Sequence, residues 1–283
     1  MSKRKKVCLL SLAAVTAVLV PWMVWGNITV GTTRYTVASS RLPAAFDHYR
    51  MVVVSDFHNA EYGDHNRQLV RQIAAEQPDS IVFTGDLLDS RQPNLDIVED
   101  LIRELTAIAP CYYVTGNHEA RLVDQFPLLE QMLLAHSVVV LHDEAVPLTR
   151  NGETIQLAGL DDPDFTDRNA SIQQSMLETK LRNLNLAADY RILLSHRPEC
   201  FDAYVAAEMD LVLSGHAHGG QFRLPLVGGL IAPNQGFFPK YDGGVYTEQG
   251  TTMIVSRGVG NSILPVRFNN RPELVSVELV HAE

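Results

Sequence analysis

The sequence predicts an α/β fold, a layered sandwich of mixed β-sheets flanked by helices, preceded by one N-terminal transmembrane helix. The main observation is a short apolar run that recurs along the chain and ends abruptly in a polar residue. These runs lack the alternation of a half-exposed strand, so each is expected to be a strand buried on both faces. They cover residues 51–55, 80–85, 111–116, 191–195 and 211–215.

Segments with helical spacing of apolar residues lie between these runs. They cover residues 66–77, 95–108, 171–184 and 199–209. Strands and helices therefore alternate, which predicts a layered α/β architecture. In the tail, residues 251–256 and 274–280 are strand-like with no helix between them, so we expect an antiparallel sheet edge there.

Composition places the chain among ordinary globular proteins. It has 283 residues, of which 46% are hydrophobic and 20% charged, and this excludes a disordered or collagen-like chain. The three cysteines, Cys8, Cys111 and Cys200, are too few and too scattered for a disulfide framework or a thiolate metal site. We expect a basic cluster with an anchor at 1–26, a connecting segment at 27–49 and one large domain at 50–283.

Charge is distributed unevenly along the chain. Four of the 23 basic residues lie in the first six positions, and no acidic residue precedes Asp47. The rest of the chain therefore carries 19 basic and 33 acidic residues. A body this acidic repels a phosphate backbone, so we expect no nucleic-acid partner.

The N-terminus has the pattern of a membrane anchor. Val7 to Trp25 runs 19 residues without a charge, which as a helix spans roughly 28 Å, close to the hydrocarbon thickness of a bilayer. Trp22 and Trp25 close the run, where indoles favour the headgroup layer. Because the basic cluster stays cytoplasmic, we predict a single-pass protein of the cell membrane with its domain outside the cytoplasm. A signal peptide cleaved after Gly26 and a buried core helix are the alternatives.

Each predicted strand of the body ends in a residue that can bind a metal ion. The residues that follow the five strands are Asp56, Asp86, Asn117, His196 and His216. In α/β sheets the carboxyl ends of strands are where sites assemble. Asp56-x-His58 and His216-x-His218 each place two donors on the same side of an extended segment. Oxygen and imidazole ligands suit hard or borderline divalent metals, so the sequence predicts a metal site.

Together these motifs resemble the complete motif set of the calcineurin-like metallophosphoesterases. The set reads Asp56-x-His58, Gly85-Asp86, Gly116-Asn117-His118-Glu119, His196 and Gly215-His216-Ala217-His218. The resemblance covers residues 50–283 and implies the metallophosphoesterase fold. The family usually has Asp after the asparagine–histidine pair, where this chain has Glu119; that position mainly supports the loop.

The C-terminal part is similar to a bacterial, often membrane-anchored, phosphodiesterase-like branch of that family, whose members act on phosphodiesters or lipid-linked pyrophosphates. This similarity is carried by Gly215 to Gln221, Pro233, Pro239-Lys240-Tyr241, Ser256-Arg257-Gly258 and Pro265. Arg257 could bind a substrate phosphate, since guanidinium matches phosphate geometry. A surface salt bridge is the alternative for Arg257.

The resemblance implies two divalent metal ions and assigns their ligands by position. Asp56, His58 and His218 would hold the first ion, Asn117, His196 and His216 the second, and Asp86 would bridge both. His118 directly follows a ligand, so it would act on the leaving oxygen as a general acid or stabilise charge there. Nitrogen and oxygen ligands without thiolate suit Mn²⁺, Fe²⁺ or Zn²⁺.

The sequence thus predicts a membrane-anchored, metal-dependent phosphoric ester hydrolase with its catalytic domain at 50–283. It would hydrolyse a phosphodiester or pyrophosphate bond by attack of metal-bound hydroxide. Tethering favours a lipid-linked envelope substrate, which the apolar stretch Leu224–Ile231 would contact unless it is a buried loop. The alternatives are a phosphomonoesterase or nucleotide hydrolase of the same fold, a non-catalytic metal-binding receptor or scaffold, and a metal-dependent peptidase or amidase.

Overall fold

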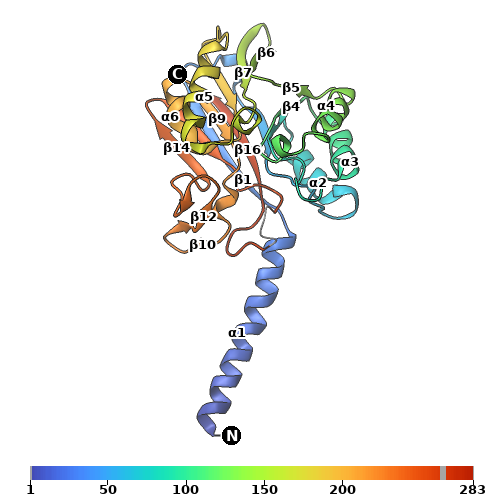
Figure 1. Cartoon of the computed structure of the whole chain (residues 1–283), viewed down its shortest axis with the longest axis vertical. Helices are drawn as coiled ribbons and strands as arrows, with labels where there is room; N and C mark the ends of the chain where they lie inside the picture. The colour runs from blue at the N-terminus through green and yellow to red at the C-terminus, as the bar shows by residue number, and fades with distance from the viewer. Residues whose placement is uncertain (1, 262–265, 283) are drawn as a thin grey trace.

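The computed structural model describes residues 2–261 and 266–282. The chain forms one long N-terminal helix, α1 (Lys3–Ile28), and an α/β domain from which that helix projects (Figure 1). Pro265, one of the residues that carry the family resemblance, lies outside the described residues.

Two six-stranded mixed sheets form the centre of the domain. Their strand orders are β1-β16-β2-β3-β4-β5 and β14-β15-β9-β8-β7-β6. The first sheet contains β1 (Gly31–Ser39), β16 (Glu273–His281), β2 (Tyr49–Val54), β3 (Ser80–Thr84), β4 (Cys111–Val114) and β5 (Val139–Val140). The second contains β14 (Gly244–Glu248), β15 (Thr251–Val255), β9 (Leu211–Ser214), β8 (Arg191–Leu194), β7 (Glu153–Gly159) and β6 (Glu144–Arg150).

Helices cover the outer face of each sheet. The helices on the first sheet are α2 (Arg67–Ala75), α3 (Leu95–Thr106) and α4 (Phe126–Ala135), and those on the second are α5 (Ala170–Asn183) and α6 (Phe201–Ala206) (Figure 1). The domain therefore has four layers, and the predicted sandwich of mixed sheets flanked by helices is confirmed. Helix α4 was not expected from the sequence, although it buries Leu129 and Leu133 at helical spacing.

The central strands are buried on both faces. In β2, Met51 and Val53 pack between the two sheets, whereas Val52 and Val54 pack beneath the helices of the first sheet. Successive side chains of a strand point to opposite faces, so a strand with two apolar environments shows no polar alternation. This is why the five runs read as continuous apolar segments.

The two tail strands belong to different sheets. β15 runs parallel to β9 and antiparallel to β14, which forms the edge of the second sheet. β16 is antiparallel to β2, but it is no edge strand because β1 pairs with its other side in parallel. The expected antiparallel edge is therefore present only in the second sheet. Residues 27–49, expected as a connection, contribute β1 to the first sheet.

The end of the domain nearest α1 carries two small hairpins. They are formed by β10 (Arg223–Leu224) with β11 (Gly228–Gly229) and by β12 (Ile231–Ala232) with β13 (Gly236–Phe237) (Figure 1). Leu226 and Val227 are exposed at the turn of the first hairpin. The stretch Leu224–Ile231 is thus a surface hairpin, and its interpretation as a buried loop is wrong.

Helix α1 is long and apolar enough to cross a membrane. Its most apolar 18-residue window has a mean hydropathy of 2.3, and none of that window is buried against the domain. The alternative of a buried core helix is therefore wrong.

We expect Leu213→Ala in β9 to lower the free energy of unfolding by about 2–5 kcal/mol, because Leu213 fills space between the two sheets and its truncation leaves a cavity. Urea denaturation of the detergent-solubilised full chain measures the loss. The matched control is Leu134→Ala on α4, whose side chain is 57% exposed; its expected effect is within about 0.5 kcal/mol. Equal losses in the two variants would contradict the assigned core.

Candidate metal centre

The structure brings all seven predicted ligand side chains to one buried place. They follow β2, β3, β4, β8 and β9, so four come from the ends of first-sheet strands and three from the ends of second-sheet strands. None is more than 6% exposed: Asp56, His58, Asp86, Asn117, His196, His216 and His218. Parallel strands place their carboxyl ends at the same edge, and the two sheets present those edges to each other.

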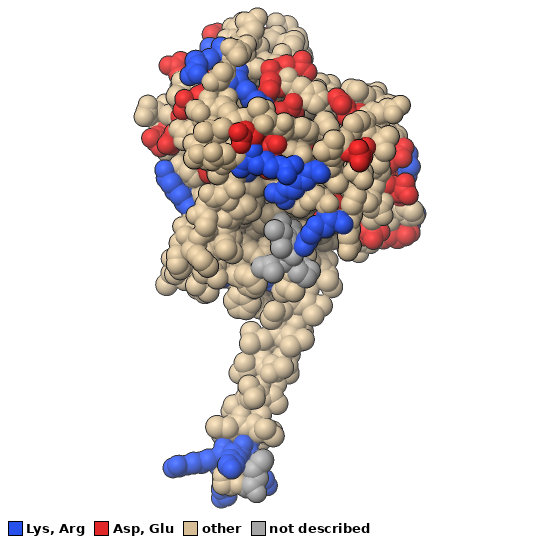
Figure 2. Space-filling view, viewed as in Figure 1, with Lys and Arg blue, Asp and Glu red and all other residues tan. Residues whose placement is uncertain are grey.

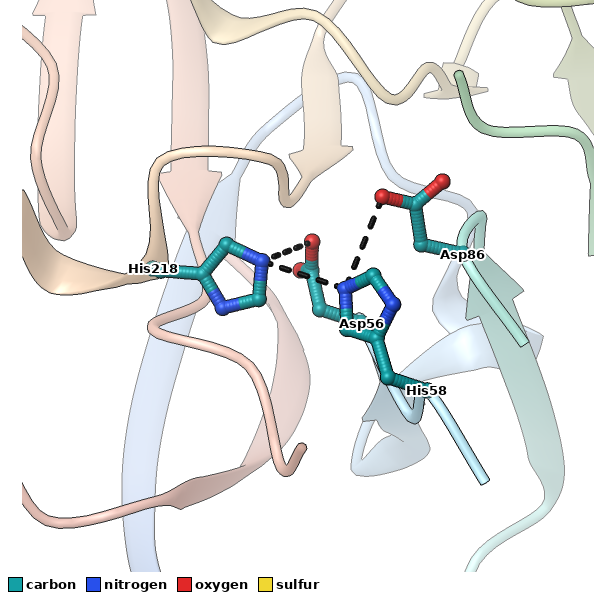
Figure 3. A group of neighbouring side chains, drawn as sticks. All are labelled: Asp56, His58, Asp86 and His218. Atoms are coloured by element: carbon teal, nitrogen blue, oxygen red, sulfur yellow. Dashed lines mark hydrogen bonds and ion pairs between the residues drawn. The ribbon is translucent and has the colours of Figure 1, made fainter. Parts of the chain in front are cut away.

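One group of donors is formed by Asp56, His58, Asp86 and His218 (Figure 3). One ligand atom of each lies within 4.8 Å of those of the others. His58 Nε2 is 3.2 Å from His218 Nε2 and 3.6 Å from Asp86 Oδ2. His218 Nε2 is also 3.3 Å from Asp56 Oδ1. The group contains the three residues assigned to the first ion together with the assigned bridge.

A second group is formed by Asp86, His196 and His216. His196 Nε2 lies 3.2 Å from Asp86 Oδ2 and 3.1 Å from His216 Nδ1. Asn117 Oδ1 is 3.2 Å from the same His196 nitrogen. Asp86 is therefore shared by the two groups, which is the position that a bridging carboxylate requires.

The donor set fits divalent cations. Two imidazole nitrogens and two carboxylates converge in the first group, and all four side chains are buried. Buried polar atoms normally have partners, because desolvation without compensation is costly. A cation in each group would be coordinated by the converging lone pairs, and imidazole with oxygen is a ligand set that Mn²⁺, Fe²⁺ and Zn²⁺ accept.

Backbone geometry in the turns after the strands allows this convergence. A Cβ atom on Gly116 would lie 2.2 Å from Asp86 Oδ1, and one on Gly215 would lie 1.9 Å from Ser55 Oγ, so both positions require glycine. Positive φ angles of 46° to 66° occur at five of the predicted ligands, Asp56, His58, Asp86, His216 and His218. Such a conformation costs roughly 1–2 kcal/mol per residue, so the surrounding packing must hold it in place.

Hydrogen bonds to the backbone fix the tautomers of two histidines. His196 Nδ1 donates to the Thr84 carbonyl at 2.8 Å, which leaves its Nε2 as the free ligand atom. His118 Nδ1 accepts from the Ser90 amide at 3.0 Å, so the neutral ring carries its proton on Nε2. The backbone amide of His118 also donates to Asp86 Oδ1 at 2.8 Å.

Glu119 holds the loops that carry Asp86 and Asn117. Its carboxylate accepts hydrogen bonds from the amides of Asp86, Gly116 and Leu88 at 2.8–3.0 Å. Burial, together with the charge of Asp86, raises the pKa of Glu119 to about 7. Glutamate therefore performs the loop-supporting role at the position where the family usually has aspartate.

Charges in the centre set which groups are protonated before a metal binds. Burial lowers the pKa of His58 to about 3, so this ring is neutral. Burial opposes ionisation of Asp86, but His196 and His118 hold its pKa well below the usual value. Burial likewise opposes protonation of His196, yet Asp86 and Asp56 raise its pKa to about 10. The metal-free centre therefore holds an Asp86–His196 ion pair.

Three residues beside the centre were not singled out in the sequence. Asp89 lies within 4.8 Å of His58 and His118, and its spacing of three from Asp86 was a signal that could have found it. Arg197 directly follows His196; it binds Asp162 through two hydrogen bonds and lies 3.2 Å from His216 Nε2. Arg267 lies 3.3 Å from His218 Nδ1, but it comes from a distant loop and has no signal in the sequence.

Arg257 lies apart from the two donor groups. Its guanidinium donates to Glu273 at 2.7 Å and lines a cavity where α1 meets the domain. Asp161 also lies outside the two donor groups; it accepts a hydrogen bond from the Thr115 hydroxyl and contacts His142. Cys111 and Cys200 are free and buried in separate clusters, on the outer faces of different sheets.

A four-layer α/β sandwich with buried carboxylate, amide and imidazole donors at its strand ends defines a metal-dependent hydrolase. Residues 49–220 match the family model for calcineurin-like phosphoesterases, and the chain belongs to that family of metal-dependent phosphoester hydrolases. It is 31% identical over 250 residues to the uncharacterized metallophosphoesterase YkuE of Bacillus subtilis, covering 87% of this chain and 84% of that protein.

Two further relatives carry informative names. The phosphodiesterase YaeI of Escherichia coli is 27% identical over 215 residues, 72% of each chain. A bovine transmembrane protein with a metallophosphoesterase domain is 30% identical over 260 residues, which cover 87% of this chain and 56% of that protein.

We expect metal binding at pH 8 to release about one proton more from the wild type than from His196→Gln, because His196 is protonated in the metal-free protein and must bind the ion as a neutral ring. The release should diminish as the pH rises through 10. Isothermal titration calorimetry in buffers of different ionisation enthalpy measures it.

His142→Gln is the matched control for this experiment. The hydrogen bond that His142 donates to Asp161 raises the pKa of His142 to about 9, but the ring lies outside both donor groups. The control should release as many protons as the wild type, whereas His196→Gln should not. Unchanged release in His196→Gln would contradict the assignment.

Proposed function

We propose that the chain is a membrane-anchored dinuclear-metal phosphoesterase that hydrolyses a phosphodiester or pyrophosphate bond. The observation that carries this proposal is the sharing of Asp86 by two buried donor groups. Asp56, His58 and His218 would hold one ion with Asp86, and Asn117, His196 and His216 would hold the other. The catalytic domain would comprise residues 50–283.

Two divalent ions in this arrangement supply a nucleophile at neutral pH by lowering the pKa of water, and they neutralise phosphate charge. The protein provides the geometry and the proton. Asn117 contributes a neutral oxygen, which limits the negative charge of the ligand set and leaves it attractive to phosphate. His118 holds its proton on Nε2 because Ser90 occupies Nδ1, so it can donate a hydrogen bond to the leaving oxygen.

One finding supports diester chemistry, and another favours an enzyme over a non-catalytic receptor. The E. coli relative is named a phosphodiesterase, which supports diester chemistry. A non-catalytic receptor would be expected to lose ligands, yet all seven are present and buried together. Phosphomonoesters and nucleotides fit the same donors and are the competing substrates. The metals would be Mn²⁺, Fe²⁺ or Zn²⁺.

Helix α1 supports the anchoring part of the proposal. It is apolar and projects from the domain with a cluster of Lys and Arg at its far end (Figure 2). Basic residues favour the cytoplasmic side, so the domain would lie outside the cytoplasm on a single-pass anchor in the cell membrane. Two relatives are themselves named transmembrane proteins. A domain held at a bilayer favours a lipid-linked envelope substrate.

The first test compares hydrolysis of an aryl phosphodiester and the matching aryl monoester by the manganese-loaded full chain in detergent. Asp86→Asn serves as the blank. Turnover that is absent from the blank supports the hydrolase, and a preference for the diester supports the assigned bond. Clear preference for the monoester would overturn the diester assignment.

We expect Asp86→Asn to lose both bound metals as well as activity, since a neutral amide is a much weaker bridging ligand than the carboxylate whose Oδ2 faces both donor groups. Elemental analysis after gel filtration measures the metal content. The control is Asp202→Asn on α6, an exposed carboxylate that should retain two ions. An Asp86→Asn protein that keeps two metals and near-normal turnover would disprove the bridging role.

We expect His118→Ala to retain the metals and to lower turnover about 10²–10⁴-fold, the usual contribution of a positioned proton donor. The loss should be greatest on substrates with poor leaving groups, because these need the donated hydrogen bond most. Rates across a series of aryl leaving groups measure this. His136→Ala, which removes a surface partner of Glu99, is the control. If metal content falls in His118→Ala, the residue is structural.

A further inference from the structure

A cavity of about 280 Å³ lies where α1 meets the domain, and its use is not explained by the metal centre. One wall is the last turn of α1, with Trp22, Trp25 and Asn27. The other wall comes from the C-terminal loop, with Arg257, Arg267 and Arg271. The cavity is therefore enclosed between the proposed anchor and the catalytic domain.

The lining of this cavity is strongly basic. Three arginines line it and, among the described residues, no carboxylate does. Arg257 has one buried partner, Glu273, whereas Arg267 and Arg271 make their hydrogen bonds to neutral groups. Burial and the nearby charge of Arg257 lower the pKa of Arg271. Positive charge is thus in excess here, in a domain that is acidic as a whole.

The arginines are held in place by the end of α1. Arg271 stacks over the Trp25 ring at 4.6 Å and donates to the carbonyls of Thr29 and Val30. The amide side chain of Asn27 binds both the backbone N–H and the carbonyl of Arg267, at 2.7 and 2.9 Å. A preorganised guanidinium loses little conformational freedom when it binds an oxyanion.

The same end of the molecule has the features of a surface that faces a bilayer. Trp22 and Trp25 are 39% and 50% exposed at the end of the apolar helix, where indoles occupy the headgroup layer. The hairpins beside α1 expose Leu226, Phe237 and Phe238 (Figure 1). Trp22 contacts Phe268 edge to face, and Phe268 is bridged to Phe222 of the first hairpin. Figure 2 shows a patch of basic side chains on the face of the domain above α1, with acidic side chains next to it.

We propose that this cavity binds the phosphate group of an anionic membrane lipid. Arg257 and Arg271 would donate to the phosphate oxygens, since guanidinium and phosphate match in geometry and charge. The exposed indoles and hairpin side chains would contact the neighbouring lipids of the bilayer. This inference rests on the proposed anchoring of α1, and it concerns a site separate from the metal centre.

Fluorescence offers a direct test, because Trp22 and Trp25 are the only two tryptophans of the chain and both line the cavity. The full chain in a neutral detergent is titrated with dihexanoyl phosphatidylglycerol, with dihexanoyl phosphatidylcholine and with inorganic phosphate. We expect saturable quenching or a spectral shift with phosphatidylglycerol at concentrations at least about tenfold below those of the other two, because the arginines repel the choline cation of phosphatidylcholine and inorganic phosphate lacks acyl chains to contact the exposed indoles. Equal responses to phosphatidylcholine, or to inorganic phosphate, would overturn a site for an anionic lipid.

Variants of the cavity residues test where phosphatidylglycerol binds. Arg271→Gln should weaken phosphatidylglycerol binding about tenfold or more, whereas Arg103→Gln, which removes a surface arginine of α3 paired with Asp100, should not change it. Arg271→Lys keeps the positive charge and should bind phosphatidylglycerol more tightly than Arg271→Gln. This difference would show that the loss in Arg271→Gln is not a folding defect. Unchanged affinity in Arg271→Gln would overturn the proposal.

Two measurements in the same samples separate this site from the proposed function. Arg271 contacts no predicted metal ligand, so Arg271→Gln should turn over the soluble aryl phosphodiester as the wild type does. Flotation of the wild-type chain with phosphatidylcholine vesicles tests anchoring alone. Flotation with normal turnover but no response to phosphatidylglycerol would reject the lipid site and leave the enzyme assignment standing.

Discussion

The structure depends on the crowding of charged and polar donors around Asp86. Its carboxylate contacts His58 and His196 and accepts a hydrogen bond from the backbone amide of His118, in a space almost closed to water. Such a group is costly to bury unless each oxygen has partners. The unusual local features follow from this demand: glycines where a Cβ would collide with a carboxylate or hydroxyl, left-handed backbone at several ligands, and Glu119 holding three amides in place.

The centre is also a product of how the two sheets pack. Asp56, Asp86 and Asn117 extend from the first sheet, whereas the histidines at 196, 216 and 218 extend from the second. The apolar core between the sheets, with Met51 and Val53 facing Leu211 and Leu213, therefore sets the separation of the two halves of the ligand set. The packing of the core therefore also determines how the ligands are placed at its edge.

Local features were predictable from the sequence, and long-range pairings were not. Strand β2 and Asp56 could be identified because a doubly buried parallel strand is apolar up to the residue that enters the site. The pairing of β1 with β16 joins the two ends of the chain, and no local pattern reports such a partner. The contact between Arg267 and His218 could not be predicted for the same reason, because the two residues lie 49 positions apart in the sequence. The motif around Arg257 made it a candidate phosphate ligand, but only the folded structure shows that it lies beside α1.

The short junction between α1 and the domain limits where the enzyme can work. Helix α1 ends at Ile28 and β1 begins at Gly31, so only two residues separate the proposed span from a strand built into the sheet. A long flexible stalk would let a tethered domain sample a wide volume around its anchor. With α1 in a membrane as proposed, this short junction would instead keep the domain beside the bilayer, and its substrates would have to reach it along the membrane surface.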